Sequence, residues 1–251
     1  HRDLHSFPTR RSSDLQYFIQ IDIPHFKCNF RFKSELPGWK PEGYKTLHHS
    51  GKKKCEFYWV VPQPRAIVTG EFTFKNKNYP ITGGIGYHDH NYLKVDRTDP
   101  LYLDALADKW YWGKCHAGRF TMIFTDVHFK NSRSQGIMVA ENNKITNCLY
   151  SLVECSVKES AYDPTLRTGY PKSLIIKSLD EYFPYKAEFV FEKILDKKDL
   201  LEGVNTVLRF LIKKLVAKPV YHGIFCKVRF EIQNTYLEGY GNFESMVFRG
   251  K

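Results

Sequence analysis

Five consecutive polar side chains follow a glycine-rich stretch in the segment ITGGIGYHDHNYL. If this segment forms a β-strand, its successive side chains alternate between the two faces of the strand. Tyr87, Asp89 and Asn91 then share one face, whereas His88 and His90 share the other. The preceding glycines permit a bulge or a close approach of the backbone at the corner of a barrel. The alternation therefore defines two candidate sites with different chemistry.

The first candidate site is the carboxyl group of Asp89, with Tyr87 and Asn91 as its neighbours. A carboxyl group that is desolvated among aromatic rings can serve as a general acid near neutral pH. Aromatic residues make up 16% of the chain, which is enough to line a hydrophobic pocket. The alternative is structural, with Asp89 accepting hydrogen bonds from backbone amides in an inter-strand network. The catalytic interpretation makes Asp89 the proton donor.

The second candidate site is the pair His88 and His90, which lie two residues apart and could chelate one metal ion on a strand. His116, in the segment KCHAGRF, could supply a third ligand. However, the sequence contains no HExxH motif and no Cys/His spacing typical of a metal site. The six cysteines are widely spaced, without a CxxC pair, and we expect them to be reduced thiols. We therefore predict neither a metal nor a cofactor.

Trp110 and Trp112 begin another predicted strand and share one of its faces. Aromatic rings stabilise cations, including carbocations, through the negative potential above the ring plane. Packing in a hydrophobic core explains such large side chains equally well. The residues expected to contact a substrate are His88, His90, Asn91, Trp110 and Trp112.

The elements that must position these residues are mostly strands. Segments such as YFIQIDI, FKCNFRF, AIVTGEFTF, RFTMIFTDVHF and GIFCKVRFEI alternate between apolar and polar residues and are bounded by Gly, Pro and Asn. This pattern is typical of half-buried antiparallel strands, and many such strands at short spacing indicate barrels or sandwiches. No GxGxxG or Walker sequence follows a strand, which argues against a nucleotide-binding α/β fold.

One segment, 197–217, has the apolar spacing of an amphipathic helix instead. Asp196 or Asp199 could cap its start, and Pro219 follows its end. We expect its apolar stripe to pack against the outside of a barrel, because no second helix is predicted to cover it. The alternative is peripheral contact with an anionic membrane. The basic residues on its other face are Arg209, Lys213 and Lys214.

Length and charge restrict the function further. The 251 residues are 42% hydrophobic and 26% charged, which excludes a disordered chain and allows one large domain or two small ones. The net charge of +11 would suit an anionic partner, but no known nucleic-acid-binding motif surrounds the scattered Lys and Arg residues. We therefore predict no nucleic-acid partner. The sequence assigns no cellular compartment.

Several motifs occur in an order that resembles the hydroxyneurosporene synthase (carotenoid 1,2-hydratase) and AttH-like family. They are W-x-V-P-x-P-R-A-x-V-x-G at 59–70, G-x-G-Y-H-D-H-N at 84–91, W-x-W-G at 110–113 and G-x-G-x-x-E at 239–244. The resemblance covers most of Tyr17 to Met246, and Y-x-D-H-N is its most specific piece. One departure is Asn91-Tyr92, where many members have Asn-Trp-Gly.

The resemblance implies an all-β fold of tandem lipocalin-like antiparallel β-barrels, with one amphipathic helix near the C-terminus. Residues 16–99 would be the remnant of an incomplete first domain, and 101–251 the second domain. Residues 1–15, HRDLHSFPTRRSSDL, resemble the conceptual translation of sequencing-adapter DNA, so we expect them to lie outside the fold.

The resemblance also implies an activity. Carotenoid hydratases of this kind add water to a terminal isoprenoid double bond without a cofactor. Asp89 would donate the proton, and Tyr87 and Trp59 would help to hold the cation. Related members are linked to cyclisation, so we expect a cofactor-independent hydratase or cyclase that acts on an isoprenoid or another hydrophobic polyene. The alternative is a non-catalytic, lipocalin-like carrier of a hydrophobic lipid.

Overall fold

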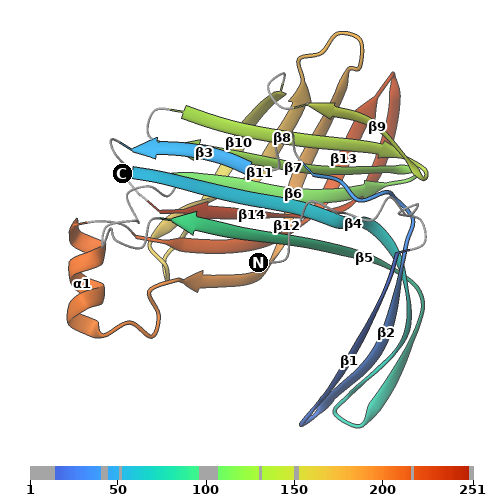
Figure 1. The fold of residues 1–251 in the computed structure, drawn as a ribbon, viewed down its shortest axis with the longest axis horizontal. Helices are drawn as coiled ribbons and strands as arrows, with labels where there is room; N and C mark the ends of the chain where they lie inside the picture. The colour runs from blue at the N-terminus through green and yellow to red at the C-terminus, as the bar shows by residue number, and fades with distance from the viewer. Residues whose placement is uncertain are drawn as a thin grey trace.

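The computed structural model describes residues 15–40, 45–50, 53–95, 107–129, 132–149, 153–215 and 218–248. Within these ranges the chain forms two antiparallel sheets and one helix (Figure 1). The all-β fold class predicted from the alternating pattern is therefore confirmed. Residues 1–14 of the expected artefact and the expected domain boundary at 99–101 lie outside the described residues, and both stay predictions.

The first sheet has five strands and is built around the long strand β4. β4 pairs along most of its length with β5, and its other side pairs with β2 and β3 at opposite ends. Lys75 and Asn76 both have positive φ angles, 48° and 64°, which suits the two-residue turn between β4 and β5. The strands are β1 (Gln16–Ile23), β2 (Phe26–Ser34), β3 (Lys45–Ser50), β4 (Lys53–Phe74) and β5 (Lys77–Val95).

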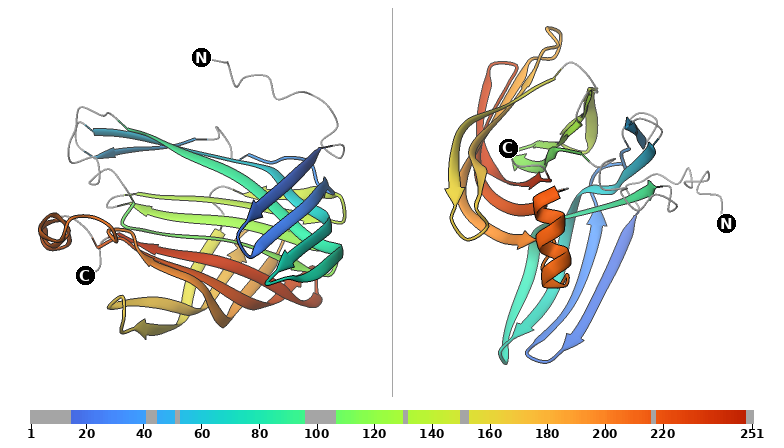
Figure 2. Two further views of the ribbon diagram at one scale, coloured as in Figure 1. Left: turned by 90° about the horizontal axis from the view of Figure 1, so that it is seen from below. Right: turned by 90° about the vertical axis from the view of Figure 1, so that its left-hand side faces the viewer.

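The second sheet has nine strands in the order β10-β11-β12-β13-β14-β6-β7-β8-β9. It curls strongly around its own core, as the two views of Figure 2 show. The path of paired strands begins at β10 and ends at β9. The strands are β6 (Lys109–Ala117), β7 (Phe120–Phe129), β8 (Ser132–Glu141), β9 (Lys144–Leu149), β10 (Val153–Asp163), β11 (Thr168–Ser178), β12 (Tyr185–Asp199), β13 (Val220–Ile232) and β14 (Thr235–Val247).

Side chains from both halves of the curled sheet share one core. Phe124 of β7 packs on Phe189 of β12, with ring centroids 5.2 Å apart, and both are fully buried. Arg133 of β8 donates hydrogen bonds to Asp126 of β7 and to the carbonyl oxygen of Cys155 of β10, the latter at 3.2 Å. This guanidinium group links strands near the two ends of the pairing path.

A second, smaller apolar cluster lies where the two sheets meet. The first sheet and its connections contribute Leu36, Trp39, Trp59 and Val61, and the outer side of β7 and β8 contributes Ile123, Met138 and Ala140. Tyr87 of β5 and Trp112 of β6 pack against this cluster. The candidate residues of the two sheets therefore meet at this interface.

The predicted helix at 197–217 is corrected at its start, and residues 216–217 at its predicted end lie outside the described residues. β12 continues to Asp199, because its residues up to that point pair with β13, and the helix α1 spans Thr206–Leu215. Asn205, rather than Asp196 or Asp199, caps it by accepting a 3.0 Å hydrogen bond from the Val207 amide. No helix in the described ranges is long and apolar enough to span a membrane.

The expected packing of α1 is also wrong in the described part of the helix. Its side chains Val207, Leu208 and Phe210 are each more than half exposed. α1 lies at one end of the nine-stranded sheet and projects away from the strands (Figures 1 and 2). The apolar stripe therefore faces outward rather than onto the sheet.

Candidate active site between the two sheets

The carboxylate of Asp89 is held by two side chains of the first sheet. Trp59 Nε1 and Tyr87 Oη each donate a 3.0 Å hydrogen bond to the same oxygen, Asp89 Oδ2. Tyr87 and Asp89 share a face of β5, as the alternation predicts, and Trp59 reaches them from the neighbouring strand β4. The register of β4 and β5 shifts just after this point, between Val60 and Gln63. The bulge increases the local twist where the three side chains converge.

Four aromatic side chains form a continuous series of ring contacts that includes both donors to this carboxylate. The centroid of the Trp59 ring lies 5.1 Å from that of Trp39 and 6.5 Å from that of Trp112. The Tyr87 ring lies 5.5 Å from Trp112. Trp112 comes from β6, so the second sheet closes the aromatic cluster that the first sheet begins. We call these four rings together with Asp89 the Asp89 cluster.

Two charged residues of the second sheet border the Asp89 cluster. The ammonium nitrogen of Lys114 lies 3.6 Å from the centroid of the Tyr87 ring. Burial lowers the pKa of Lys114 to about 8, although the charges of Asp89 and Glu244 oppose this shift. Burial raises the pKa of Glu244, with a contribution from Asp89, while a 3.0 Å hydrogen bond from the Tyr221 hydroxyl acts in the opposite direction.

The tyrosine of the cluster is held in its neutral form. Burial is the largest cause of the raised pKa of Tyr87, and the neighbouring Asp89 and Glu244 raise it further. A neutral phenol is a hydrogen-bond donor, which is the role that Tyr87 has toward Asp89. The neutral hydroxyl of Tyr87 therefore donates its hydrogen bond to Asp89.

The structure brings together four of the predicted site residues, namely Trp59, Tyr87, Asp89 and Trp112. It leaves the other four outside the cluster. The His88 ring contacts Tyr17 edge-to-face at 4.8 Å, and His90 and Asn91 are exposed. Trp110 shares the face of Trp112 on β6 but packs on Phe248, with ring centroids 5.3 Å apart.

The histidines do not assemble into a metal site in the part of the chain that the structure describes. No three His, Cys, Asp or Glu side chains come together there in a way that could hold a metal ion. His116 Nδ1 instead lies 3.0 Å from the Thr121 hydroxyl, and burial lowers the pKa of His116 to about 4.

Residue spacing alone did not identify Trp39, Lys114 or Glu244 as members of the site. Alternation along the strand could have identified Lys114, because Lys114 follows Trp112 on the same face of β6. Glu244 ends the G-x-G-x-x-E motif and pairs directly with Trp112 in the register of β14 and β6. Trp39 lies in a connection and forms an isolated bridge with Val61, for which no periodic signal exists.

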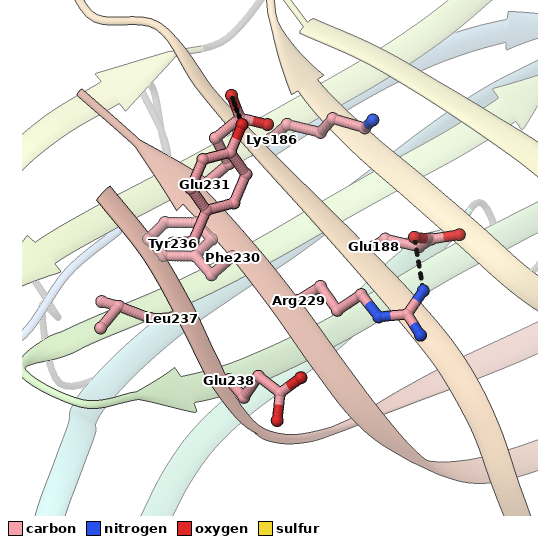
Figure 3. Close-up of a pocket in the computed structure, with 8 residues that line it drawn as sticks. All are labelled: Lys186, Glu188, Arg229, Phe230, Glu231, Tyr236, Leu237 and Glu238. Carbon is pink, nitrogen blue, oxygen red and sulfur yellow. Dashed lines mark hydrogen bonds and ion pairs between the residues drawn. The ribbon is translucent and has the colours of Figure 1, made fainter. Parts of the chain in front are cut away.

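A surface groove on the second sheet differs in character from the aromatic pocket predicted from the sequence. It lies on β12, β13 and β14 and is bordered by paired charges (Figure 3). Arg229 contacts Glu188 at 3.4 Å, and the Tyr236 hydroxyl donates a 3.0 Å hydrogen bond to Glu231. The groove residues are Lys186, Glu188, Arg229, Phe230, Glu231, Tyr236, Leu237 and Glu238.

Solved structures share this architecture. An AttH protein from Nitrosomonas europaea superposes with a TM-score of 0.63 at 15% identity, over 94% of this chain and 66% of that protein. Kievitone hydratase from Nectria haematococca gives 0.61 at 14% identity, over 93% of this chain and 64% of the hydratase. The chain has the AttH-like, lipocalin-like fold. A structure of CghA with Sch210972 is also similar, with a TM-score of 0.58 at 12% identity.

One curated relative is similar in sequence. The chain is 26% identical over 114 residues to the quinolone epoxide rearrangement protein asqO of Emericella nidulans. This match covers 45% of the chain and 29% of asqO. The sequence matches no family model. The chain thus spans less than a third of asqO and just under two thirds of the solved hydratase.

Proposed function

We propose that the Asp89 cluster is the active site of a cofactor-independent enzyme. In this proposal Asp89 protonates a double bond of a hydrophobic isoprenoid or polyene substrate, and hydration or cyclisation follows. The observation that carries the proposal is the pair of 3.0 Å hydrogen bonds that fix one carboxyl oxygen among aromatic rings. The two donors occupy Oδ2, so Oδ1 is the oxygen that would carry the proton and donate it to a substrate.

The reaction needs few protein groups. The proton of the Asp89 carboxyl group forms a C–H bond as the π bond of the substrate breaks, which leaves a carbocation at the more substituted carbon. The rings of Trp59 and Trp112 stabilise that cation through their faces. Water, or a second double bond of the same substrate, then adds to the cation. Loss of a proton to the Asp89 carboxylate completes the cycle and restores the acid.

The similar proteins support this class of chemistry. Kievitone hydratase is named for a hydration and asqO for an epoxide rearrangement, and CghA has been solved with Sch210972. Hydration and rearrangement can both begin with protonation of the substrate by a positioned acid. The carotenoid substrate class rests on the motif resemblance, centred on Tyr87 and Asp89.

The position of Lys114 favours a second candidate, the acid-catalysed opening of an epoxide. Its ammonium group lies 3.6 Å from the centroid of the Tyr87 ring and would repel a carbocation placed there. The same charge would stabilise negative charge that develops on an oxygen atom of the substrate. In this reaction Asp89 protonates the epoxide oxygen as the C–O bond breaks, while water or a neighbouring group of the substrate adds to the same carbon, so that no free carbocation forms. The proton that the adding group loses returns to the Asp89 carboxylate. An oxygen-bearing substrate would therefore use Lys114, whereas a hydrocarbon would not.

The test compares wild type with Asp89→Asn on the same preparations. Acyclic isoprenoid polyenes and aryl epoxides are incubated with each protein, and the products are identified by mass spectrometry. A general acid contributes about 10²–10⁴-fold in rate, so Asp89→Asn should remove most of the product while the melting temperature changes little. Asp22→Asn, at an exposed ion pair with Lys27, is the matched control and should retain activity.

Three results would contradict the proposal. A parallel loss of melting temperature and product in Asp89→Asn would make Asp89 a structural residue of the sheet interface. Undiminished product in a well-folded Asp89→Asn would exclude Asp89 as the acid. Tight binding of a polyene without any product, in wild type and variant alike, would support the carrier instead.

A further inference from the structure

The described part of the helix α1 exposes a group of four large apolar side chains. Large exposed apolar patches on folded proteins usually mark sites of interaction with a partner or a membrane. This helix follows β12 and projects from the end of the nine-stranded sheet (Figure 1). Its exposed apolar side chains, with their exposed fractions, are Val207 (69%), Leu208 (52%), Phe210 (61%) and Leu211 (44%).

Two salt bridges explain why this surface faces outward. Arg209 and Lys213, one helical turn apart, both bind the carboxylate of Asp199 at the end of β12. Their shared face is therefore turned toward the protein, and Val207 and Leu211 lie on the opposite face of the helix. A surface helix normally has the reverse arrangement, with its apolar face on the core and its charges in water.

The inverted orientation is fixed at more than one point. Asp199 is nearly buried, and its second oxygen accepts a 3.0 Å hydrogen bond from the Leu201 amide. Asn205 caps the first turn of the helix through the Val207 amide. The Asp199 carboxylate that binds the two basic side chains is thus itself held in place. It therefore fixes the orientation in which the apolar side chains of α1 face outward.

The positive charge around this apolar surface favours an anionic partner. Residues 203–219 contain no Asp or Glu, and Lys214 lies beside the apolar face with its ammonium group 5.8 Å from the centroid of the Phe210 ring. Lys218, which is exposed, follows the helix. A second copy of this chain would bring the same net charge of +11, so self-association through this face meets repulsion. An anionic lipid surface complements both the cations and the apolar side chains.

We propose that α1 docks this protein on membranes that carry acidic headgroups. Val207, Phe210 and Leu211 enter the boundary between headgroups and acyl chains, while Lys214 reaches the lipid phosphates. Arg209 and Lys213 stay on Asp199 and hold the helix in the docking orientation. This inference does not depend on the proposed chemistry at Asp89.

The test is flotation of the full chain with two kinds of vesicle, phosphatidylcholine alone and phosphatidylcholine mixed with phosphatidylserine. We expect binding to the mixed vesicles, much weaker binding to phosphatidylcholine, and release by added salt. The double variant Phe210→Ser/Leu211→Ser should lower the bound fraction about tenfold, because the apolar face drives insertion. Lys214→Glu should weaken binding to the mixed vesicles only.

Phe18→Ser is the matched control, since Phe18 on β1 is 70% exposed and lies in the other sheet. Its binding should equal that of wild type. Equal losses in Phe18→Ser and in the helix variant, or no binding of wild type to the mixed vesicles, would overturn the proposal. So would a concentration-dependent dimer, detected by light scattering, that the helix variant abolishes, because a second copy would then be the occupant.

Discussion

The ammonium group of Lys114 lies over the ring of Tyr87, 3.6 Å from its centroid. A charged residue of the second sheet thus contacts the candidate site on the first sheet. Burial at this interface lowers the pKa of Lys114 to about 8, against an ordinary value of 10.5. The contact with the face of the Tyr87 ring favours the charged form of the lysine. Lys114 can therefore change its charge in a pH range that is easily reached in solution.

A pH-dependent stability follows from this lysine. A lowered pKa means that folding disfavours the charged form, so the penalty is present below about pH 8 and is lifted as the pH rises toward 10.5. The free energy of unfolding of wild type should rise over this range relative to Lys114→Met, by at most about 3 kcal/mol. Denaturant titrations of both proteins, at steps across this range, measure the difference.

Lys27→Met is the control for Lys114→Met, because Lys27 is exposed and pairs with Asp22 at the surface. It should follow wild type at every pH. A constant offset between wild type and Lys114→Met would show that Lys114 does not change its charge here. If the Lys114 charge also supports catalysis, wild-type turnover declines above about pH 8 and the variant lacks that decline.

The fold was predictable from the sequence because a period of two is a local property. Alternation along β5 placed Tyr87 and Asp89 on one face, and the motif order added Trp59. The packing of one sheet on the other has no such period, so Trp39 and Lys114 entered the site only through the structure. The orientation of α1 could not be predicted from the sequence pattern either, since it depends on the carboxylate of Asp199 in the preceding strand.

Removing either donor to Asp89 tests how the carboxyl group is positioned. Trp59→Phe and Tyr87→Phe each delete one of the two 3.0 Å hydrogen bonds and keep an aromatic ring. Each should lower kcat about tenfold with little change in KM, because a misplaced acid costs more in the transition state than in substrate binding. Steady-state kinetics of the two variants and of Tyr79→Phe, a half-buried ring of β5 that stacks on Phe72, give the comparison. A change in KM alone would mean that both residues contact substrate rather than position Asp89.

Asp126 should make the second sheet sensitive to acid. Burial by itself would raise the pKa of Asp126, but the hydrogen bonds from His128 and Arg133, at 2.8 Å and 2.6 Å, outweigh it and lower the pKa to about 2. A lowered carboxyl pKa contributes stability above the ordinary value of 3.8 that is lost as the pH falls through about 2. The contribution is about 2 kcal/mol.

Chemical unfolding of wild type and Asp126→Asn, from neutral pH down to about pH 2, measures that contribution. The variant is the less stable protein at neutral pH, because it leaves Arg133 without its carboxylate partner. The gap between the two should narrow as the pH falls and Asp126 is protonated in wild type. A gap that stays constant to the lowest pH would show that the pKa of Asp126 is not lowered.

The glycines of the G-x-G-x-x-E motif allow the backbones of β14 and β6 to approach closely. Substitution of a glycine with alanine tests this role. A Cβ at Gly239 would lie 2.0 Å from the carbonyl oxygen of His116, and one at Gly241 would lie 2.5 Å from that of Lys114. Both contacts are with the backbone of β6, which cannot move aside as a flexible side chain can. Gly239→Ala should therefore lower the free energy of unfolding by about 1–3 kcal/mol or more.

Gly83→Ala, with no atom within 4 Å of the new Cβ, is the matched control and should stay within about 0.5 kcal/mol of wild type. Equal effects of the two substitutions would mean that the backbones of β14 and β6 do not approach closely at this motif, and close approach would then not explain its glycines.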